Sequence, residues 1–564
     1  MASLTKKIIR GRPYYYLREC KRVDGKPKIV WQKYLGSAAD LVCRLTETPT
    51  PASALVREFG ASAACFDIAQ ELDIVGIVDR HLPKRGTRGP SVGEYLLIAA
   101  LNRCLAPRSK SRLGAWYQGT VLPRLVSVRS SQLTSQRFWD NMSRVDEDAI
   151  TSIEHDLAQA AVTQFGLDLH CLLFDATNFF SFVDSFDLRC ELPQRGHSKE
   201  GRDSLRIVGL ALLVTADGDV PLFHHCYAGN QHDSTTFATV IPKIAHRCRE
   251  ISQGAADITL VFDKGNNSQE NLTAVAGQQI HFVGSLVPTH HPELLAIGRD
   301  EMRRLDKAQL PAVWSHRTKK VLFGVERTVL VTFNRPLFRA QLKTLRREVN
   351  KRQRKLERLR VSLERGAHRN AGKKATLDGT RKRVDGLLAA RHMKELFTVE
   401  VRQGREELPE ISWSFNNTGW EQLKRTLLGK TILFTDRAEW TDEQIVRYYR
   451  SQAHVESAFR GMKDPRCLAF RPVHHWTDQK LRVHALYCVM ALMVLALLRR
   501  KLAKAQFSTS FAHMVEQLSD IREVTALFQD EDAKRPRSSC TLSELNAEQQ
   551  KMLHALGLAR YRVP

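Results

Sequence analysis

Apolar runs of strand length dominate the chain from residue 168 to residue 286. They alternate with helical patterns in the order three strands, helix, strand, helix, strand. Because the strands are apolar throughout, we expect an α/β fold whose sheet is covered by helices on both faces. The predicted strands are residues 170–174, 205–214, 220–227, 258–262 and 280–286, and the predicted helices are residues 234–250 and 268–276.

Two kinds of pattern precede this region. Residues 7–36 indicate strands around a Val-Asp-Gly-Lys turn signal at residues 23–26, which predicts a β-hairpin. Residues 51–165 are mostly helical in pattern, and one helix begins with a capping box at Ser91, with glutamate three places on. The short polar and basic helices over residues 130–150 fit a helix-turn-helix DNA reader and an ordinary helical domain equally well.

Residues 287–440 interrupt the α/β pattern, and they begin and end in strand-like sequence. Between these ends, residues 337–374 hold fourteen Lys and Arg against three Asp and Glu, with apolar residues at heptad spacing. A second, weaker helix over residues 380–396 would complete a basic helical hairpin, residues 337–396. The charges of this hairpin either bind phosphates or form a solvated surface. Either interpretation allows the apolar heptad residues to pack against each other inside the hairpin.

The pattern is helical again from residue 441 to about residue 503. Its longest apolar stretch, residues 485–498, is too short to span a bilayer and fits a buried core helix. Residues 504–564 form a basic, mixed tail from which the sequence predicts no role.

Four polar residues share one face of the predicted helix that carries them. Tyr449, Gln452, Glu456 and Lys463 fall within about 60° of one another around a helix axis. A phenol, an amide, a carboxylate and an ammonium would thus face the same way. A ladder of charges in solvent would give the same spacing.

The charge balance favours a polyanionic partner. The chain has 86 Lys and Arg against 61 Asp and Glu, a net charge of +25, and neutralised phosphates release counterions, so nucleic acid is favoured over a generic basic role. The eleven cysteines form no C-x-x-C pair and indicate reduced thiols. The charged first residues are followed by no apolar run, so we expect no signal peptide and a cytoplasmic, nucleoid-associated bacterial protein.

Two aspartates, Asp175 and Asp263, directly follow apolar runs. Ligands bind at strand ends in α/β sheets, and carboxylates are the hard ligands that Mg²⁺ prefers. Two such ions can activate a nucleophile and stabilise a leaving oxygen in phosphodiester chemistry. The alternative is that each aspartate only caps the following turn or helix, and both interpretations stay open.

Two other signals are weaker. The Gly-Lys-Thr triplet at residues 429–431 would end a P-loop, but Lys424 stands where that loop needs glycine. His224, His225 and His232 lack the cysteine or carboxylate spacing of a zinc site, so we expect structural roles for them.

The face of the 449–463 segment resembles the Y-R-E-K signature (Y-x2-R-x3-E-x6-K) of bacterial insertion-sequence DDE transposases. Tyr449, Glu456 and Lys463 match it at the family's spacing, and Gln452 stands at the arginine position. This departure leaves a phosphate contact to be supplied by a neighbouring arginine, of which Arg450, Arg447 and Arg460 are the candidates.

The other motifs of the family follow in order. Asp175 and Thr177 match D-x-T, and Asp263 with the following Lys264 and Gly265 matches D-[KR]-G. The acids are 88 and 193 residues apart, and the long second gap resembles members with a β-rich insertion. Further similarity lies in residues 195–205, residues 227–234 and residues 14–36, the last typical of a long-chain subgroup.

The resemblance implies an RNase H-like catalytic core interrupted by a β-rich insertion that carries the basic hairpin, after a mostly helical N-terminal DNA-binding region. The expected regions are residues 1–50 (β-hairpin), 51–166 (helical DNA-binding domain), 167–286 (core, first part), 287–440 (insertion), 441–503 (core, second part) and 504–564 (tail).

The resemblance also implies the chemistry, which is cleavage of transposon ends and strand transfer into target DNA. Asp175, Asp263 and Glu456 would be catalytic and would hold two Mg²⁺ or Mn²⁺ ions. The residues expected to bind DNA phosphates are Tyr449, Lys463, Gln452, Arg450, Arg460, Lys264, Lys199 and Arg202.

The expected partners are double-stranded DNA, as inverted-repeat ends and target, and a second copy of the chain in a synaptic complex. Trp413, Trp420 and Trp440 are candidates for stacking on a flipped base, although core packing is favoured for each. The alternatives are an RNase H-like nuclease of another role and a domesticated DNA-binding protein without catalysis.

Overall fold

The computed structural model describes most of the chain and divides it into two compact units. The described residues are 2–23, 26–46, 51–86, 89–183, 190–201, 204–252, 257–367, 374–404, 408–471, 473–528 and 537–563. Unit 1 comprises Met1–Gly60, Gly119–Val121 and Gln517–Pro564, and unit 2 comprises Ala61–Gln118 and Leu122–Glu516.

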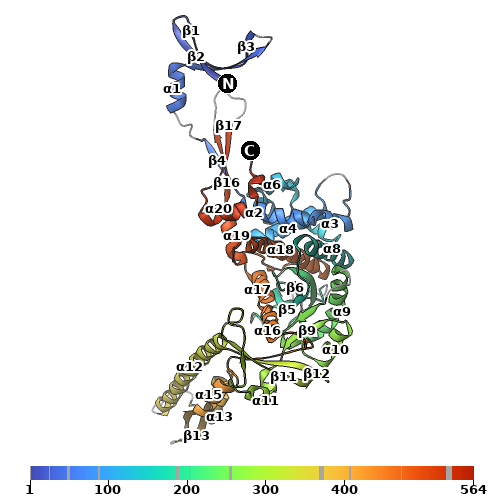
Figure 1. The fold of residues 1–564 in the computed structure, drawn as a ribbon. Coiled ribbons are helices and arrows are strands. Elements are labelled where there is room, and N and C mark those ends of the chain that lie inside the picture. Colours follow the sequence, from blue (N-terminus) through green and yellow to red (C-terminus); the bar gives the residue numbers. More distant parts are fainter. Residues whose placement is uncertain are drawn as a thin grey trace. The chain divides into compact units, whose positions relative to one another are not determined.

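A nine-stranded mixed sheet organises unit 2, in the order β10-β11-β12-β15-β9-β8-β5-β6-β7 (Figure 1). The five strands predicted from the apolar runs form one half of it, β5 (Cys171–Ser181), β6 (Arg206–Thr215), β7 (Pro221–Ala228), β8 (Thr259–Val261) and β9 (His281–Ser285). β5 pairs antiparallel with β6 and parallel with β8, and β8 pairs parallel with β9. This order, third-second-first-fourth-fifth, fits the RNase H-like core expected from the sequence.

Helices cover both faces of the sheet, as the apolar strands predicted. The two predicted crossover helices are α9 (Asp233–Ile251) and α10 (Gln269–Gly277). Phe237 of α9 contacts the rings of Phe174 and Phe262 at 5.1 and 4.9 Å on one face. On the other face Phe179 stacks on Phe470 at 4.3 Å. Because neighbouring strand residues alternate between faces, Asp175 and Thr177 share the face of Phe179.

The long apolar helix α18 (Asp478–Lys504) belongs to the core of unit 2. It is the one helix among the described residues that is long and apolar enough to cross a membrane, and 94% of its most apolar window is buried inside the protein. It packs against β7, α4 (Val92–Leu105) and α8 (Glu147–Phe165). The predicted capping box at the start of α4 is present, with Ser91 and Glu94 bonded reciprocally.

The region expected as an insertion continues the core sheet at its other side. β10 (Arg303–Arg304), β11 (Val313–Leu322), β12 (Val325–Asn334) and β15 (Lys430–Thr435) are its strands. β15 pairs antiparallel with β9, so the strand-like ends predicted for this region extend the core sheet.

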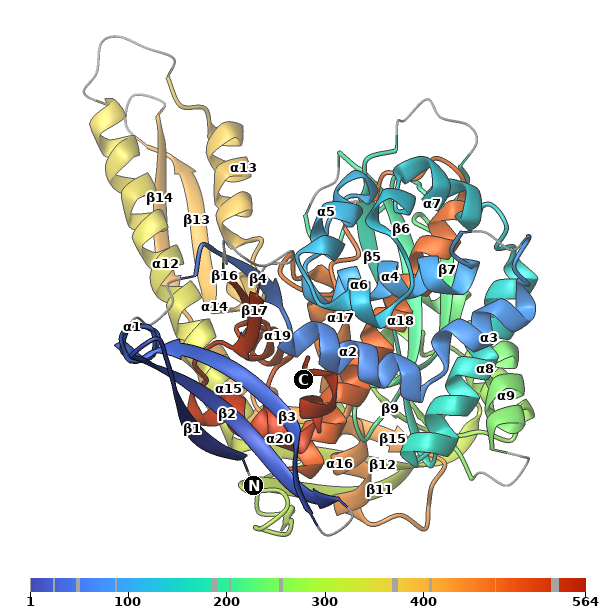
Figure 2. The ribbon, with the colours of Figure 1, turned by 90° about the horizontal axis from the view of Figure 1, so that it is seen from above.

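A helical hairpin and a small two-stranded sheet extend from these strands, and Figure 2 shows them side by side. Their elements are α12 (Arg335–Ala367), α13 (Leu377–Leu388), α14 (Met393–Leu396), β13 (Phe397–Gln403), β14 (Pro409–Phe415) and α15 (Asn417–Thr426). The heptad residues Leu345, Val349, Leu356 and Leu359 are buried, which confirms the apolar seam. The predicted second helix is divided into α13 and α14, and His392, which precedes α14, has a φ of +65°.

Unit 1 contains more strands than the sequence predicted. β2 (Arg12–Val23) and β3 (Lys26–Ser37) form the predicted hairpin, and β1 (Ala2–Ile9) adds a third strand before α1 (Ala38–Thr46). A second sheet joins distant parts of the chain in the order β17-β16-β4, from β4 (Ser53–Glu58), β16 (Arg522–Phe528) and β17 (Arg537–Leu542). The tail therefore pairs with residues near the N-terminus. The turn residues Asp24 and Gly25 lie outside the described residues.

A buried ionic cluster joins α8 and α9 to the edge strand β7. Glu154 accepts hydrogen bonds from the backbone N–H and the ring of His224, and Arg247 donates to its other oxygen at 3.2 Å. Burial raises the pKa of Glu154, but the charges of His224 and Arg247 outweigh it and hold that pKa below its usual value. His224 therefore has the structural role expected from the sequence.

We expect Glu154→Ala to lower the free energy of unfolding by about 3–5 kcal/mol, because it leaves the buried guanidinium of Arg247 without an anion and His224 without its hydrogen-bond acceptor. Urea denaturation measures this loss. Asp156→Ala on the same helix is the matched control, since its partners Arg80 and His81, each at 2.9 Å, are 61% and 27% exposed and therefore in contact with solvent. The control should cost at most about 1 kcal/mol, and equal losses in both variants would contradict the expectation.

Candidate functional site

Asp175 lies within β5 and not at its end. The sequence placed it at the end of an apolar strand, but β5 continues to Ser181, paired throughout with β6. What ends near Asp175 is the parallel pairing with β8, whose last partners are Leu173 and Val261. Asp175 is half-buried, in keeping with a carboxylate on a face that a helix partly covers.

Asp263 occupies the equivalent position after β8. It lies two positions after Val261, as Asp175 lies two positions after Leu173, so both acids point to the same face of adjacent strands. Asp263 precedes a short 3-10 helix but its side chain caps no backbone N–H there. It is exposed, and the hydroxyl of Ser285 lies 3.5 Å from its Oδ1. The capping alternative is therefore wrong for Asp263.

The segment predicted as one helix forms two, α16 (Asp442–Arg450) and α17 (Gln452–Lys463), which meet at Ser451. The Ser451 hydroxyl donates to the carbonyl of Arg447 at 3.2 Å, a back-bond that bends helices. α17 packs against β5 and β6, on the face that carries Asp175. The break falls between Tyr449 and Glu456, and the two residues still belong to the same site.

Tyr449 connects the second and third acids. Burial raises the pKa of Tyr449, and the carboxylates of Asp263 and Glu456 raise it further, against a hydrogen bond from Ser285 that lowers it. The phenol is therefore within electrostatic reach of both acids. Glu456 is exposed, and among the described residues neither it nor Asp263 forms an ion pair.

Lys463 lies beside the first acid at the other end of α17. Its Nζ donates to the hydroxyl of Thr177 at 2.9 Å and is 3.8 Å from Glu200. Burial lowers the pKa of Lys463, while Glu200 and Asp175 oppose that shift. A cation is thus held next to β5, two residues beyond Asp175.

Two residues of this site were missed from the sequence. Glu200 lies between Lys463 and Arg471, with the Arg471 contact at 2.7 Å. Arg471 also donates to the carbonyl of Lys463 at 3.1 Å and lies over the ring of Phe180. Only the similarity of residues 195–205 to the transposase pattern could have pointed to Glu200, and no motif covers Arg471.

The remaining predicted phosphate-binding residues differ in exposure. Arg450, Arg460 and Lys264 are exposed, whereas Gln452 is 8% exposed and turned into the core. Lys199 is exposed and its Nζ donates to the carbonyl of Ala176 at 2.7 Å, next to the first acid. Arg202 lies outside the described residues.

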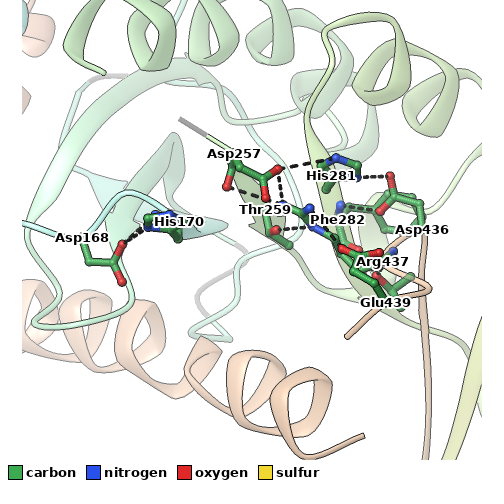
Figure 3. Close-up of polar contacts among 10 residues, drawn as sticks. Asp168, His170, Asp257, Thr259, His281, Phe282, Asp436, Arg437 and Glu439 are labelled. Carbon is green, nitrogen blue, oxygen red and sulfur yellow. Dashed lines mark hydrogen bonds and ion pairs between the residues drawn. The ribbon is translucent and has the colours of Figure 1, made fainter. Parts of the chain in front are cut away.

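At the opposite edge of the same strands, where no ligand is expected, charged side chains bond to one another (Figure 3). There Asp436 bonds the ring of His281 at 3.0 Å and the N–H of Phe282 at 2.9 Å. Arg437, 7% exposed, bonds Asp257 at 2.5 Å and the hydroxyl of Thr259 at 3.0 Å. Charges at this edge are paired, in contrast to Asp263 and Glu456.

The donor set at the acid-bearing edge fits a hard divalent cation. Asp175, Asp263 and Glu456 supply only carboxylate oxygens, and two of them hold no protein cation. Over the part of the chain that the structure describes, however, no three His, Cys, Asp or Glu side chains are close enough to hold a metal ion. The three acids therefore lie on one face and at one edge of the sheet, but their side chains are not gathered closely enough to form a complete set of metal ligands.

A cavity of about 570 Å³ opens beside the second acid. Asp263, Ser285 and Tyr449 line one side of it, and residues of α12, including Gln341 and Thr344, line the other. None of the three tryptophans considered for base stacking is among its lining residues. Instead Trp440 lies 4.8 Å from Tyr448, Trp413 contacts Phe397 and Trp420 contacts Phe415, which favours packing roles.

Comparisons with known proteins identify a family for more than half of the chain. A family model described as a transposase DDE domain matches residues 180–494, which include Asp263 and Glu456 and begin after Asp175. No curated protein matches significantly.

Two similar solved structures are of transposases. A piggyBac transposase synaptic complex with hairpin DNA has 9% identity, covers 81% of this chain and 78% of that chain, and gives a TM-score of 0.36. A Mos1 transposase paired-end complex with left transposon end has 9% identity, covers 35% of this chain and 60% of that chain, and gives a TM-score of 0.15. Both scores are low, so the fold assignment depends on the strand order.

Because Asp263 supports no cap and no ion pair, we expect Asp263→Ala to change the free energy of unfolding by no more than about 0.5 kcal/mol. Asp436→Ala at the opposite edge is the matched control and should cost about 1–3 kcal/mol, since it leaves a backbone N–H and His281 without their acceptor. Chemical denaturation of both variants tests this. An equal loss of unfolding free energy in Asp263→Ala would mean that Asp263 has a structural role.

Proposed function

The chain belongs to the transposase DDE domain family, whose model spans more than half of its residues, and we infer that Asp175, Asp263 and Glu456 are its three catalytic carboxylates. As a member of this family the protein is an enzyme that carries out DNA transposition. One observation carries the residue assignment. The parallel register of β5 and β8 puts two acids on one face, and α17 crosses that face with the third.

We propose that the three carboxylates would hold two Mg²⁺ or Mn²⁺ ions. When bound, such ions polarise the scissile phosphate and lower the pKa of a water or hydroxyl nucleophile. The family membership supports divalent-metal chemistry, and the all-carboxylate donor set supports the choice of a hard cation. The reaction proposed is hydrolysis at the element's ends, followed by attack of the freed 3′-hydroxyl on target DNA.

The cations around the acids would position the DNA backbone. Lys463 and Lys199 flank the first acid, and Lys264 follows the second directly. Arg450 and Arg460 are exposed on α16 and α17. Interactions of this kind fix the register of the strand without reading its sequence, so the scissile phosphate is held while the carboxylates act.

We assign the chain to the Y-R-E-K signature class and to its long-chain subgroup. The departure at Gln452 has a physical counterpart, since a buried amide at that position leaves no arginine to reach a phosphate. Arg450 and Arg460 are both exposed and are the substitutes we propose. A homodimer is proposed because two element ends must be held together for joining.

We expect Glu456→Gln to abolish cleavage of element ends in Mg²⁺ while leaving end binding nearly unchanged. The amide keeps the shape of the side chain but is a poor metal ligand. Gel-resolved cleavage of a labelled end duplex, with binding measured in parallel, tests this. Asp464→Asn is the control at the end of the same helix, where the acid pairs with Arg466 at 2.7 Å, and it should cleave normally. Full cleavage by Glu456→Gln would remove Glu456 from the site.

The exposed face of α12 is a second proposed DNA-binding surface. A groove of about 530 Å³ on it is lined by Lys343, Arg346, Arg347, Asn350, Lys351, Arg354, Lys355 and Arg358. We call these residues the α12 basic groove. No acid lines it, so the fourteen cations counted over residues 337–374 include a surface that suits a phosphate backbone.

We expect the triple variant Arg347→Gln, Arg354→Gln, Arg358→Gln to lower the salt dependence of DNA binding and keep the sequence preference. For every phosphate that the variant no longer neutralises, the slope of log K against log salt should flatten by about 0.9. Arg352→Gln with Arg360→Gln is the control on the same helix, because those arginines pair with Glu348 and Glu357. An unchanged slope in the triple variant would mean that the groove is only a charged face in solvent.

A further inference from the structure

The three-stranded sheet β1–β3 exposes large apolar and aromatic side chains. On the face of the sheet that carries Tyr16, Ile9 is 40% exposed, Ile29 50% and Tyr34 52%, although all lie in regular strands. Most side chains of β1 and β3 are exposed, and those of β2 from Pro13 to Glu19 are half-buried. A sheet with so little burial gains little stability from its own core, and such surfaces mark interaction sites.

The charge of this sheet selects the kind of partner. Residues 2–37 hold ten Lys and Arg against two Asp and Glu, a surplus of eight positive charges. A second copy of the same sheet would bring like charges together, which opposes association. A polyanion would be attracted by the same charges and would release counterions on binding.

The strand register sorts the side chains into two different faces. Tyr14 pairs with Lys7, and Tyr16 with Tyr34, so that their side chains share a face. Arg12 and Arg18 lie on this face because they alternate in step with the tyrosines along β2. We call it the tyrosine–arginine face, which comprises Lys7, Arg12, Tyr14, Tyr16, Arg18, Arg22 and Tyr34 with their neighbours and holds no acid.

Arg18 is held against an aromatic ring on this face. Its guanidinium lies 5.3 Å from the ring centre of Tyr16, and its buried Nε has no hydrogen-bond partner. The Tyr16 ring lies 5.2 Å from that of Tyr34. On the opposite face, by contrast, Lys21 lies 4.0 Å from Glu19. An arginine held against an aromatic ring suits bidentate recognition of guanine and of phosphate.

The dimensions of the sheet suit a DNA groove. Three strands spaced about 4.8 Å apart are roughly 10 Å wide, and the major groove is about 12 Å wide. β3 has two bulges against β2, between Tyr15 and Tyr16 and between Glu19 and Cys20. Bulges increase the right-handed twist of a sheet, which lets strands follow a curved groove. Sheets that read DNA in this way are known among β-ribbon proteins.

We propose that the tyrosine–arginine face of β1–β3 binds duplex DNA in the major groove. The proposal rests on the transposase function and adds a reading element in unit 1, whereas the three carboxylates belong to unit 2. Arg12, Arg18 and Arg22 contact guanine edges and phosphates, and the tyrosines hold the guanidinium groups in place. The helical region over residues 51–166 is then not the sole DNA-binding candidate before the core.

The test compares two triple variants of the full chain. Arg12→Gln, Arg18→Gln, Arg22→Gln removes three charges from the tyrosine–arginine face, and Lys21→Gln, Lys28→Gln, Lys33→Gln removes three from the opposite face. The probe is a fluorescein-labelled mixed-sequence duplex of about four helical turns, roughly 40 bp, used unmodified and methylated at guanine N7. We expect the arginine variant to bind the unmodified duplex roughly tenfold or more weakly, as for removal of good base-edge hydrogen bonds, and the lysine variant to change far less.

Methylation at N7 blocks the major groove edge of guanine. It should therefore weaken DNA binding by the parent protein and by the lysine variant, and it should not weaken DNA binding by the arginine variant any further. Equal losses of affinity in the two variants, or a methylation penalty that persists in the arginine variant, would overturn the proposal. Unchanged DNA affinity with a lower molar mass by light scattering would overturn it in favour of self-association. Cleavage by the arginine variant at saturating protein keeps the transposase function separate, because only the carboxylate variants should abolish it.

Discussion

The parallel pairing of β5 with β8 is the constraint on which the candidate site depends. It fixes two aspartates, 88 residues apart in sequence, at matching positions on neighbouring strands. At the other edge of the same strands Asp257, His281, Asp436 and Arg437 are joined in ion pairs. The charges at one edge therefore stabilise the fold, whereas acids at the other edge remain able to bind a ligand.

Much of this core could be predicted because its signals are local. Apolar strands, the helices between them and the capping box at Ser91 each occupy one short window, and all are present. The heptad seam of α12 was equally visible, since periodicity alone defines it. The predicted end of β5 was wrong for the same reason, because Asp175 interrupts the apolar run while the pairing with β6 continues beyond it.

The features missed from the sequence are those made by distant residues. β4 pairs with β16, more than 450 residues later in the chain, and neither segment has a pattern that names its partner. Glu200 and Arg471 meet Lys463 only after α17 has folded onto β5. The burial of Gln452 is of the same kind. Its spacing put it on the polar face, but in α17 it lies on the buried side of the helix with Val455 and Phe459.

The third acid depends on how the segment that carries it is held at both ends. At the start of α16, Asp442 accepts hydrogen bonds from Ser315 at 2.7 Å and Arg317 at 3.0 Å, both on β11. At the end of α17, Lys463 is bonded to Thr177 on β5.

The strands between these two anchors therefore set the position of Glu456. Because β11, β12 and β15 continue the core sheet, the long segment between the second and third acids does more than interrupt the fold. It supplies the strand β11, which anchors the start of α16. This anchor helps to fix where α17 carries Glu456 over the face of the first two acids. Loss of that strand pairing would displace Glu456 while leaving β5 and β8 paired, so the complete acid set requires the inserted strands.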